Sequence, residues 1–201
     1  DVVCFRVMEG NLQILLGKVV SEGNVFKGMW AHIGGLVRVN ETAEQAVERL
    51  LNDKSGIKKI YKEQLYTFSD IDRDPRGRVV SIGYIALANP KDSQDLKNVK
   101  IDNEWRSVET LPKLGYDHNK IADVALTRLR SKIIYTDIAK HFMLDEFTFS
   151  DLQKVYEAVL GEGMDKRNFR KRILSLDIIK DTKRTIKRGV MRPASLYTFK
   201  K

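Results

Sequence analysis

The sequence predicts an α+β fold made of two domains, and three observations support this prediction. Over residues 1–130, short apolar or alternating runs typical of strands are interspersed with two amphipathic helical patterns. Residues 147–201 instead begin with helices and end with strands. The charge divides at nearly the same place, since residues 151–201 hold 14 Lys and Arg against 6 Asp and Glu, whereas residues 1–150 hold 22 against 21. We therefore expect a nearly neutral first domain, a connector over residues 131–146 and a basic second domain.

Five strands are expected in the first domain, and their signals differ. The first two form a hairpin, because Glu9-Gly10-Asn11 between them has turn chemistry. The next two are separated by a charged turn over residues 70–78, which contains Pro75 and Gly77. The last is a short edge strand. The expected strands cover residues 2–8, 12–20, 65–68, 79–87 and 105–108.

Two helices are expected in the same domain. The first follows Gly34-Gly35 and has its apolar residues spaced for one face. Asn40 or Thr42 is its expected N-cap, and Gly56 is its expected end. The second helix is predicted over residues 119–131 by the same kind of spacing.

The totals exclude several classes of protein. The single cysteine, Cys4, excludes a disulfide within the chain and is typical of a reducing cytosol, so a cytoplasmic protein is expected. The sequence has no run of about 18 apolar residues, which is the length that a membrane-spanning helix needs. No cofactor is predicted.

The second domain begins with the pattern of a helix-turn-helix. A helix is expected over residues 151–160, with Ser150 as its N-cap. The turn Gly161-Glu162-Gly163 ends it, and Asp165 caps a second, basic helix over residues 166–176. In this arrangement the second helix enters the major groove of DNA by its N-terminal end.

A wing is expected after the basic helix. A strand starts at Ile178, a basic turn covers residues 183–189, and a second strand returns over residues 192–199. The alternative is an extension of a helical bundle with a frayed tail. Pro193 at the edge of the returning, alternating strand favours the wing.

The basic helix and the wing together predict a surface for double-stranded DNA. Lys and Arg that contact phosphates release counterions and supply much of the affinity. Asn168 suits adenine, and Arg167 or Arg170 suits guanine or phosphate. The alternative is an ordinary solvated basic face. The candidate DNA-binding residues are Lys166, Arg167, Asn168, Arg170 and Lys171 in the helix and Arg184, Lys187, Arg188 and Arg192 in the wing.

The loop and helix of residues 34–57 contain a known kind of motif. Gly35, five residues, Glu41, seven residues, Arg49 and then Gly56 follow one another in the spacing of the Nudix box, which they resemble. In an active Nudix hydrolase, paired glutamates of this box bind magnesium. The metal then polarises a diphosphate and activates water.

The sequence departs from this pattern at the metal-binding positions. Leu50 stands where the pattern has a glutamate, and Asp53 and Lys54 stand where it has the metal-binding pair. An ammonium at ~4 Å from a metal position costs about 1 kcal/mol even in water and more in a cleft. We therefore predict no metal site, no catalytic residues and no hydrolysis. Glu41 and Arg49 are expected to remain as structural residues that fix the loop to the helix.

Two further segments extend the resemblance. Residues 26–30 resemble the approach to a Nudix box, and residues 72–81 resemble a loop and strand of Nudix proteins that bind ADP-ribose. Arginines suit phosphate or carboxylate, and the alternative is a surface hairpin whose charges pair with one another. His32 either points into the ligand cleft or lies beside the sheet with its hydrogen bonds satisfied. The candidate ligand-binding residues are Lys18, Trp30, His32, Gly34, Gly35, Arg73, Asp74, Arg76 and Arg78.

Both domains together resemble the Nudix-related transcriptional regulators of bacteria, the NrtR type that senses ADP-ribose and the AraR type that senses arabinose. In the second domain, residues 147–153, 164–172 and 192–197 carry this resemblance. It implies a Nudix-like α/β/α mixed-sheet domain followed by a winged helix-turn-helix domain. It also implies a homodimer on a palindromic operator.

The effector implied by this resemblance is an ADP-ribose-like molecule or a sugar that alters DNA affinity, as in a repressor of NAD or sugar metabolism. One alternative is a Nudix hydrolase of nucleoside diphosphate derivatives with an appended nucleic-acid-binding module. Another is an RNA-binding or scaffold protein that uses the basic second domain.

Overall fold

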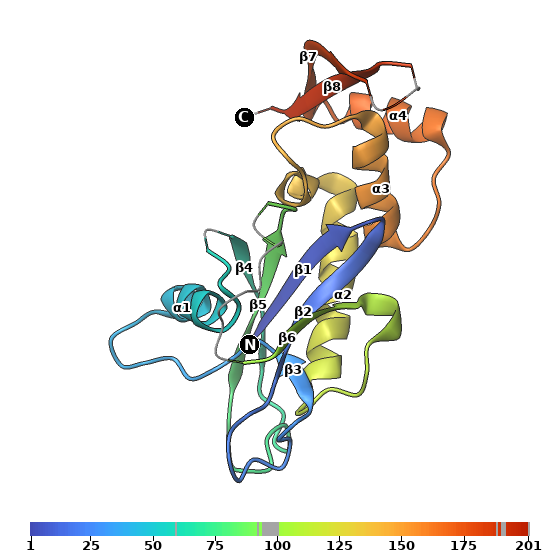
Figure 1. The fold of residues 1–201 in the computed structure, drawn as a ribbon. Helices are drawn as coiled ribbons and strands as arrows, with labels where there is room; N and C mark the ends of the chain where they lie inside the picture. Colours follow the sequence, from blue (N-terminus) through green and yellow to red (C-terminus); the bar gives the residue numbers. More distant parts are fainter. Residues whose placement is uncertain (59, 92, 94–100, 188, 190–191, 201) are drawn as a thin grey trace.

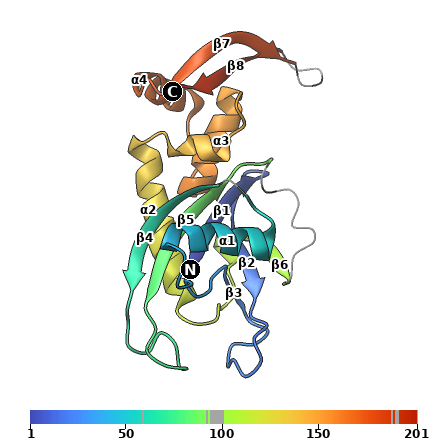
Figure 2. The same cartoon turned by 90° about the vertical axis from the view of Figure 1, so that its left-hand side faces the viewer.

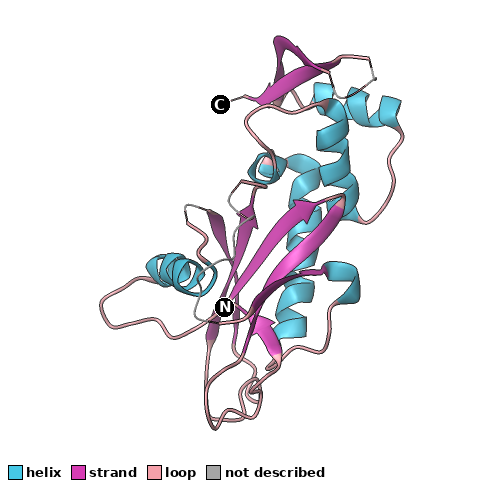
Figure 3. Ribbon diagram, viewed as in Figure 1, coloured by secondary structure: helices cyan, strands magenta, loops and turns pink. Residues whose placement is uncertain are grey.

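A computed structural model of the chain describes residues 1–58, 60–91, 93, 101–187, 189 and 192–200. The predicted α+β class is confirmed, since a mixed sheet between helices is followed by a winged helix domain (Figures 1 and 3). The two parts are joined by α2 (His118–Tyr135) and the short 3-10 helix η2 (Ile138–Phe142). Among the described residues, no helix is both long and apolar enough to cross a membrane.

The strands of the first domain form one mixed sheet. Its order is β3-β2-β1-β5-β4, and β6 also pairs with β2. The central pair β1 and β5 is parallel, whereas the other pairs are antiparallel. The predicted hairpin and the three later strands are therefore confirmed, with β3 as an addition. The bounds are β1 (Val2–Met8), β2 (Asn11–Lys18), β3 (Trp30–His32), β4 (Tyr61–Phe68), β5 (Ser81–Ala88) and β6 (Asn103–Ser107), after which comes the 3-10 helix η1 (Val108–Thr110).

Helices α1 (Ala43–Ser55) and α2 cover opposite faces of this sheet (Figures 1 and 2). Because successive residues of a strand face opposite sides, Val3 and Phe5 of β1 pack in the cluster that includes α2. Val2 and Cys4 pack in the second cluster, which includes α1. The result is the α/β/α arrangement expected from the sequence.

The ends of α1 explain how the loop before it is placed. Thr42, one of the two predicted N-caps, forms a capping box with Gln45. Gly56 ends the helix with φ of 72°, a left-handed conformation that suits glycine. Both ends of the helix are thus fixed by local sequence.

The winged helix domain differs from its prediction at two points. Helix α3 (Phe149–Leu160) starts two residues earlier than expected, because Thr148 rather than Ser150 is the N-cap and exchanges hydrogen bonds with Asp151. Strand β7 (Ile179–Ile186) runs through half of the predicted basic turn and pairs with β8 (Ala194–Phe199) across a register shift. Helix α4 (Lys166–Ser175) and its N-cap Asp165 are as predicted.

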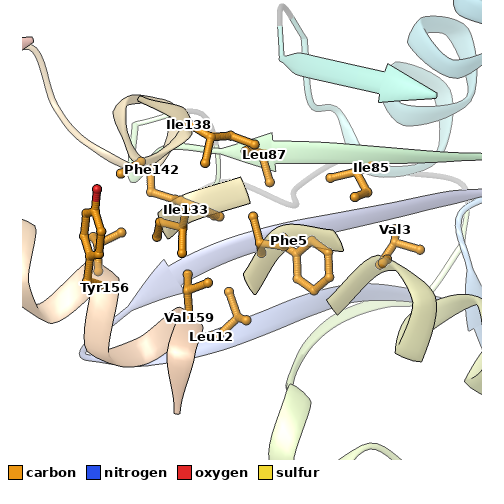
Figure 4. Packing of buried hydrophobic residues seen from close by; sticks show 14 of the residues in the cluster. Val3, Phe5, Leu12, Ile85, Leu87, Ile133, Ile138, Phe142, Tyr156 and Val159 are labelled. Atoms are coloured by element: carbon orange, nitrogen blue, oxygen red, sulfur yellow. The ribbon is translucent and has the colours of Figure 1, made fainter. Parts of the chain in front are cut away.

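The hydrophobic core does not stop at the connector between the domains. A single cluster of buried side chains runs from the sheet into the winged helix domain (Figure 4). Leu12 of β2, Ile133 of α2 and Val159 of α3 belong to it, as do Phe142 and Tyr156. The predicted connector, residues 131–146, is therefore a packed element of the core.

Candidate functional site

A cavity of about 610 Å³ lies where the loop after β3, helix α1, the turn before β5 and the start of α2 meet. Seven of the nine predicted ligand-binding residues line it, namely Lys18, His32, Gly34, Gly35, Arg73, Asp74 and Arg76. Trp30 and Arg78 do not line it. The structure thus brings most of the predicted set together, and their role in binding remains a prediction.

Two of the three arginines of the turn are already paired with carboxylates. The guanidinium of Arg73 is buried and donates to Asp117 at 2.8 and 3.1 Å and to Asp1 at 3.2 Å. Arg76 pairs with Asp74, whose pKa is lowered by the hydrogen bond from that guanidinium. The expected alternative, pairing of charges within the turn, holds for Arg76 and Asp74 in the wall of the cavity, whereas Arg73 pairs with carboxylates outside the turn.

The position of His32 combines features of both predicted placements. It lines the cavity, and it is also buried beside the sheet, where its ring stacks on His118 with centroids 5.1 Å apart. Its Nε2 lies 2.9 Å from the carbonyl oxygen of His118, and its backbone N–H donates to His118 Nδ1 at 2.9 Å. Burial lowers the pKa of His118 to about 3 and that of His32 well below its ordinary value. Both rings are therefore neutral at pH 7.

Trp30 and Arg78, which do not line the cavity, contact other side chains and backbone groups of the protein. The charged ends of Lys18 and Arg106 lie 5.3 and 5.6 Å from ring centroids of Trp30. Lys18 also pairs with Asp102 at 3.2 Å. Arg78 donates to two carbonyl oxygens of the turn, those of Ser69 and Asp70, and so fixes the turn on itself. The motif spacing does not reveal the placement of Trp30, because Arg106 comes from a distant strand, whereas Arg78 bonds carbonyl oxygens eight and nine positions before it.

One wall of the cavity was missed in the sequence. Tyr116 and His118 line the cavity just before and at the start of α2. Tyr116 has a positive φ of 57°, packs on Phe26 with centroids 4.5 Å apart and accepts a hydrogen bond from Asn24 at 2.6 Å. The available signal was the cluster of Tyr, Asp and His directly before an amphipathic helix.

Side-chain contacts hold the loop of the loop–helix motif against α1. Arg49 donates to both carboxylate oxygens of Glu41, at 2.5 and 2.8 Å, and to the carbonyl of Leu36. This hydrogen bonding lowers the pKa of Glu41 to about 2. Leu50 packs so closely on Gly35 that an added Cβ there would lie 2.7 Å from it. The predicted structural role of Glu41 and Arg49 agrees with these contacts.

The residues at the metal positions do not fit magnesium, which requires oxygen ligands from carboxylates. Leu50 is buried in the apolar cluster, and Asp53 is exposed and does not line the cavity. The Lys54 ammonium donates to the carbonyl of Gly34 at 2.6 Å. In the described part of the chain, no group of three or more His, Cys, Asp or Glu is placed to hold a metal ion.

A second candidate surface lies on α4. Gln153 and Glu157 of α3 hold the turn before it, since they bond the backbone of Met164 at 2.8 and 2.9 Å. Phe169 and Ile173 bury the inner face of α4. The predicted DNA-binding residues of this helix, Lys166, Arg167, Asn168, Arg170 and Lys171, are all exposed.

These exposed residues are not equivalent. Arg170 lies 4.3 Å from the ring centroid of Phe149 and donates to the hydroxyl of Tyr197 at 3.1 Å. By contrast, Lys166, Arg167 and Lys171 have no carboxylate within ion-pair distance in the described residues. Arg170 is thus held in place by aromatic rings, whereas the other three are free to meet an anion.

The predicted residues of the wing are also unequal. Arg184, Lys187 and Arg192 are all exposed, but Arg184 pairs with Glu146. Arg188, the fourth predicted residue, lies outside the described residues. The wing is fastened to the rest of its domain by two backbone hydrogen bonds between Phe147 and Tyr197, at 2.8 and 3.0 Å.

Comparison with protein families matches both parts of the chain. Residues 1–125 match the NUDIX domain, and residues 139–199 match the NrtR DNA-binding winged helix domain. The curated proteins include a relative from Acinetobacter baylyi, "ADPR responsive transcriptional repressor NtrR", which is 34% identical over 99% of this chain and 80% of its own length. An "ADP-ribose pyrophosphatase" from Methanocaldococcus jannaschii is 38% identical over 57% of this chain and 66% of its own length.

Solved structures give the same division. NrtR of Shewanella oneidensis in complex with a 27mer DNA is 31% identical, covers 100% of this chain and 92% of its own, and superposes with a TM-score of 0.86. The NUDIX domain of the same protein, in complex with ADP ribose, covers 64% of this chain and 85% of its own with 31% identity and a TM-score of 0.55.

Proposed function

This chain belongs to the NrtR family of transcriptional regulators, in which a Nudix domain precedes a winged helix DNA-binding domain, and we propose that ADP-ribose is the effector of its DNA binding. The observation that carries the proposal is the match over 99% of the chain to an ADPR responsive repressor. The cavity supports it, because it offers cationic groups for phosphates and polar groups for sugar hydroxyls.

We further propose that the seven predicted residues in the cavity wall contact this effector, and that the exposed cations of α4 and the wing contact DNA. Lys166 and Arg167 stand at the N-terminal end of α4, the end by which a recognition helix enters the major groove. The proposal includes a cytoplasmic homodimer that binds a palindromic operator. The dimer is needed because paired half-sites require two such helices at a fixed spacing.

Helix α2 supports a route by which the two sites are coupled. Its first residue, His118, lines the cavity. Near its other end, the carbonyl of Ile134 accepts a hydrogen bond from Arg172 of α4 at 3.0 Å, and Arg130 donates to the carbonyl of Val159 of α3. An effector changes DNA affinity only if it binds the DNA-competent and incompetent states unequally. Helix α2 is therefore the element whose position both effector binding and DNA binding would bias.

The test is fluorescence polarisation with the full chain and the DNA upstream of its own gene, at one fixed salt concentration. Sequence-specific binding that ADP-ribose releases, and that AMP and ribose 5-phosphate do not release, is the expected result. Release by arabinose alone would replace the effector with a sugar. Binding without sequence preference, or a preference for RNA, would contradict a transcriptional regulator.

We also propose that the chain does not hydrolyse its effector. The competing candidate, a Nudix hydrolase, is favoured by the 38% identity to an ADP-ribose pyrophosphatase over 118 residues. Against it stand Leu50 and Lys54, which replace carboxylates with a hydrocarbon and a cation. Release of AMP from ADP-ribose, measured with and without magnesium, decides between the two, and magnesium-dependent turnover would restore the hydrolase.

A further inference from the structure

The cations of the cavity wall differ in what already neutralises them. Lys18 pairs with Asp102, Arg73 with Asp1 and Asp117, and Arg76 with Asp74. Lys54 is the fourth cation of the wall, and in the described part of the chain it has no carboxylate partner. Among the described residues, its Nζ makes one hydrogen bond, to the Gly34 carbonyl. Since an ammonium has three N–H donors, two remain for a ligand.

The surroundings of Lys54 keep this charge in a fixed place. The side chain is half-buried, and its pKa is lowered by burial and by the nearby Arg49. Leu50, one turn earlier, packs on Gly35 in the same loop. The charge therefore stands between α1 and the loop of Gly34 and Gly35, where the helix and the loop both face the cavity.

A positive charge at this point attracts an anionic group, as a bound metal ion would. An anionic oxygen that enters the cavity meets an unneutralised ammonium whose position is set by a hydrogen bond. Charge-assisted hydrogen bonds are about twice as strong as neutral ones, and a partly buried site screens them less than water does. A divalent cation would be repelled from the same point.

We propose that the Lys54 ammonium is a built-in cation that binds the diphosphate of the effector, so that effector binding needs no divalent metal. This inference rests on the proposed function and names the group that recognises the anionic part of the effector. The competing explanation is that Lys54 only fastens the loop to α1 through the Gly34 carbonyl.

The experiment is isothermal titration calorimetry of the full chain with ADP-ribose and with inorganic pyrophosphate, in EDTA and then in magnesium. The wild type is expected to bind ADP-ribose equally in both solutions. Lys54→Gln keeps an N–H donor for the loop and removes the charge, so its affinity for both probes should fall about 10- to 100-fold. Lys54→Arg keeps the charge and should lose less. Lys62→Met is the matched control, since Lys62 pairs with Glu48 outside the cavity.

Three results would overturn the inference. Lys54→Gln with wild-type affinity and a lowered melting temperature would show a loop fastening only. A wild type that binds only with magnesium would show that Lys54 does not replace a metal. If the wild type binds neither probe, this inference and the ADP-ribose proposal both fail. If it binds pyrophosphate in a Lys54-dependent way but not ADP-ribose, the effector is wrong and the cation site stands.

Discussion

The cavity and the outer face of α4 are both rich in basic side chains, but these side chains differ in whether carboxylates of the chain neutralise them. In the cavity, Arg73 and Arg76 are bound to carboxylates of the same chain. On α4, Arg167 and Lys171 are exposed with no ion-pair partner in the described residues. A count of cations alone therefore does not locate a site for a polyanion. The paired cations shape a cavity, whereas the unpaired ones leave their charge available to phosphates.

The largest expected effect tests whether the cavity charges are structural. Arg73→Met leaves Asp1 and Asp117 in a poorly solvated place without their cation. Removing one partner of a buried ion pair costs about 3–5 kcal/mol, and the free energy of unfolding from urea denaturation should fall by that amount. Arg78→Met is the control, because Arg78 is exposed and bonds only to carbonyl oxygens. Equal and small losses in both variants would mean that the Arg73 pairs add nothing.

The next prediction tests whether a buried histidine of the cavity causes the protein to lose stability in acid. The folded pKa of His118 is about 3, below the ordinary value of 6.5, so the unfolded chain binds more protons between these values. Stability is therefore complete above pH 6.5 and is lost as pH falls toward 3. Proton uptake by His118 in the unfolded chain should lower the free energy of unfolding by about 2 kcal/mol between pH 7 and pH 5.

The matched variant for this prediction is His118→Asn, which can still accept the hydrogen bond from the His32 backbone N–H. Urea denaturation at pH 7, 6 and 5 should give a shallower loss of stability in this variant than in the wild type. A parallel loss in the two proteins would assign the acid sensitivity to other groups. Burial also lowers the pKa of His141 in η2 to about 4, so His141 contributes in the same pH window, whereas residues 147–201 contain no histidine and should not.

A third effect tests the free charges of α4. Arg167→Ala and Lys171→Ala should each weaken DNA binding about tenfold and reduce the salt dependence by about one counterion, because each is expected to contact a phosphate. Arg170→Ala should also weaken DNA binding, but it should lower the melting temperature as well, since Arg170 packs on Phe149 and Tyr197. ADP-ribose affinity should stay unchanged in all three. An equal loss of effector affinity would contradict separate sites.

Sequence alone predicts what is local in this molecule. The caps Thr42 and Asp165 and the end of α1 at Gly56 follow from residues within a few positions of one another. The start of α3 was misplaced because Ser150 and Thr148 have the same capping chemistry, and the choice depends on Asp151 three residues after Thr148.

The contacts that define the cavity are distant and could not be predicted in this way. Arg73 meets Asp117 across 44 positions, and Lys54 meets the Gly34 carbonyl across 20. Motif spacing identified Arg73 as a binding residue and Lys54 as a defect in the metal site. Whether a charge is neutralised by its own chain is a property of the folded structure, and among the described residues Arg73 is paired with carboxylates whereas Lys54 is not.

The smallest effect concerns the one carboxylate that stands at the start of α4. Asp165 accepts hydrogen bonds from the backbone N–H groups of Arg167 and Asn168, at 3.1 and 2.9 Å, and α4 itself contains no acidic residue. Asp165→Ala should destabilise the helix by about 1 kcal/mol and weaken DNA binding, because the N-terminal turn that presents Arg167 frays. Asp165→Asn keeps the cap and removes a negative charge near the phosphates, so its DNA affinity should equal or exceed that of the wild type. Thermal unfolding and fluorescence polarisation measured on both variants separate the two roles. If Asp165→Asn weakened DNA binding as much as Asp165→Ala, the carboxylate charge itself would be needed, and the outer face of α4 would depend on an internal anion as the cavity does.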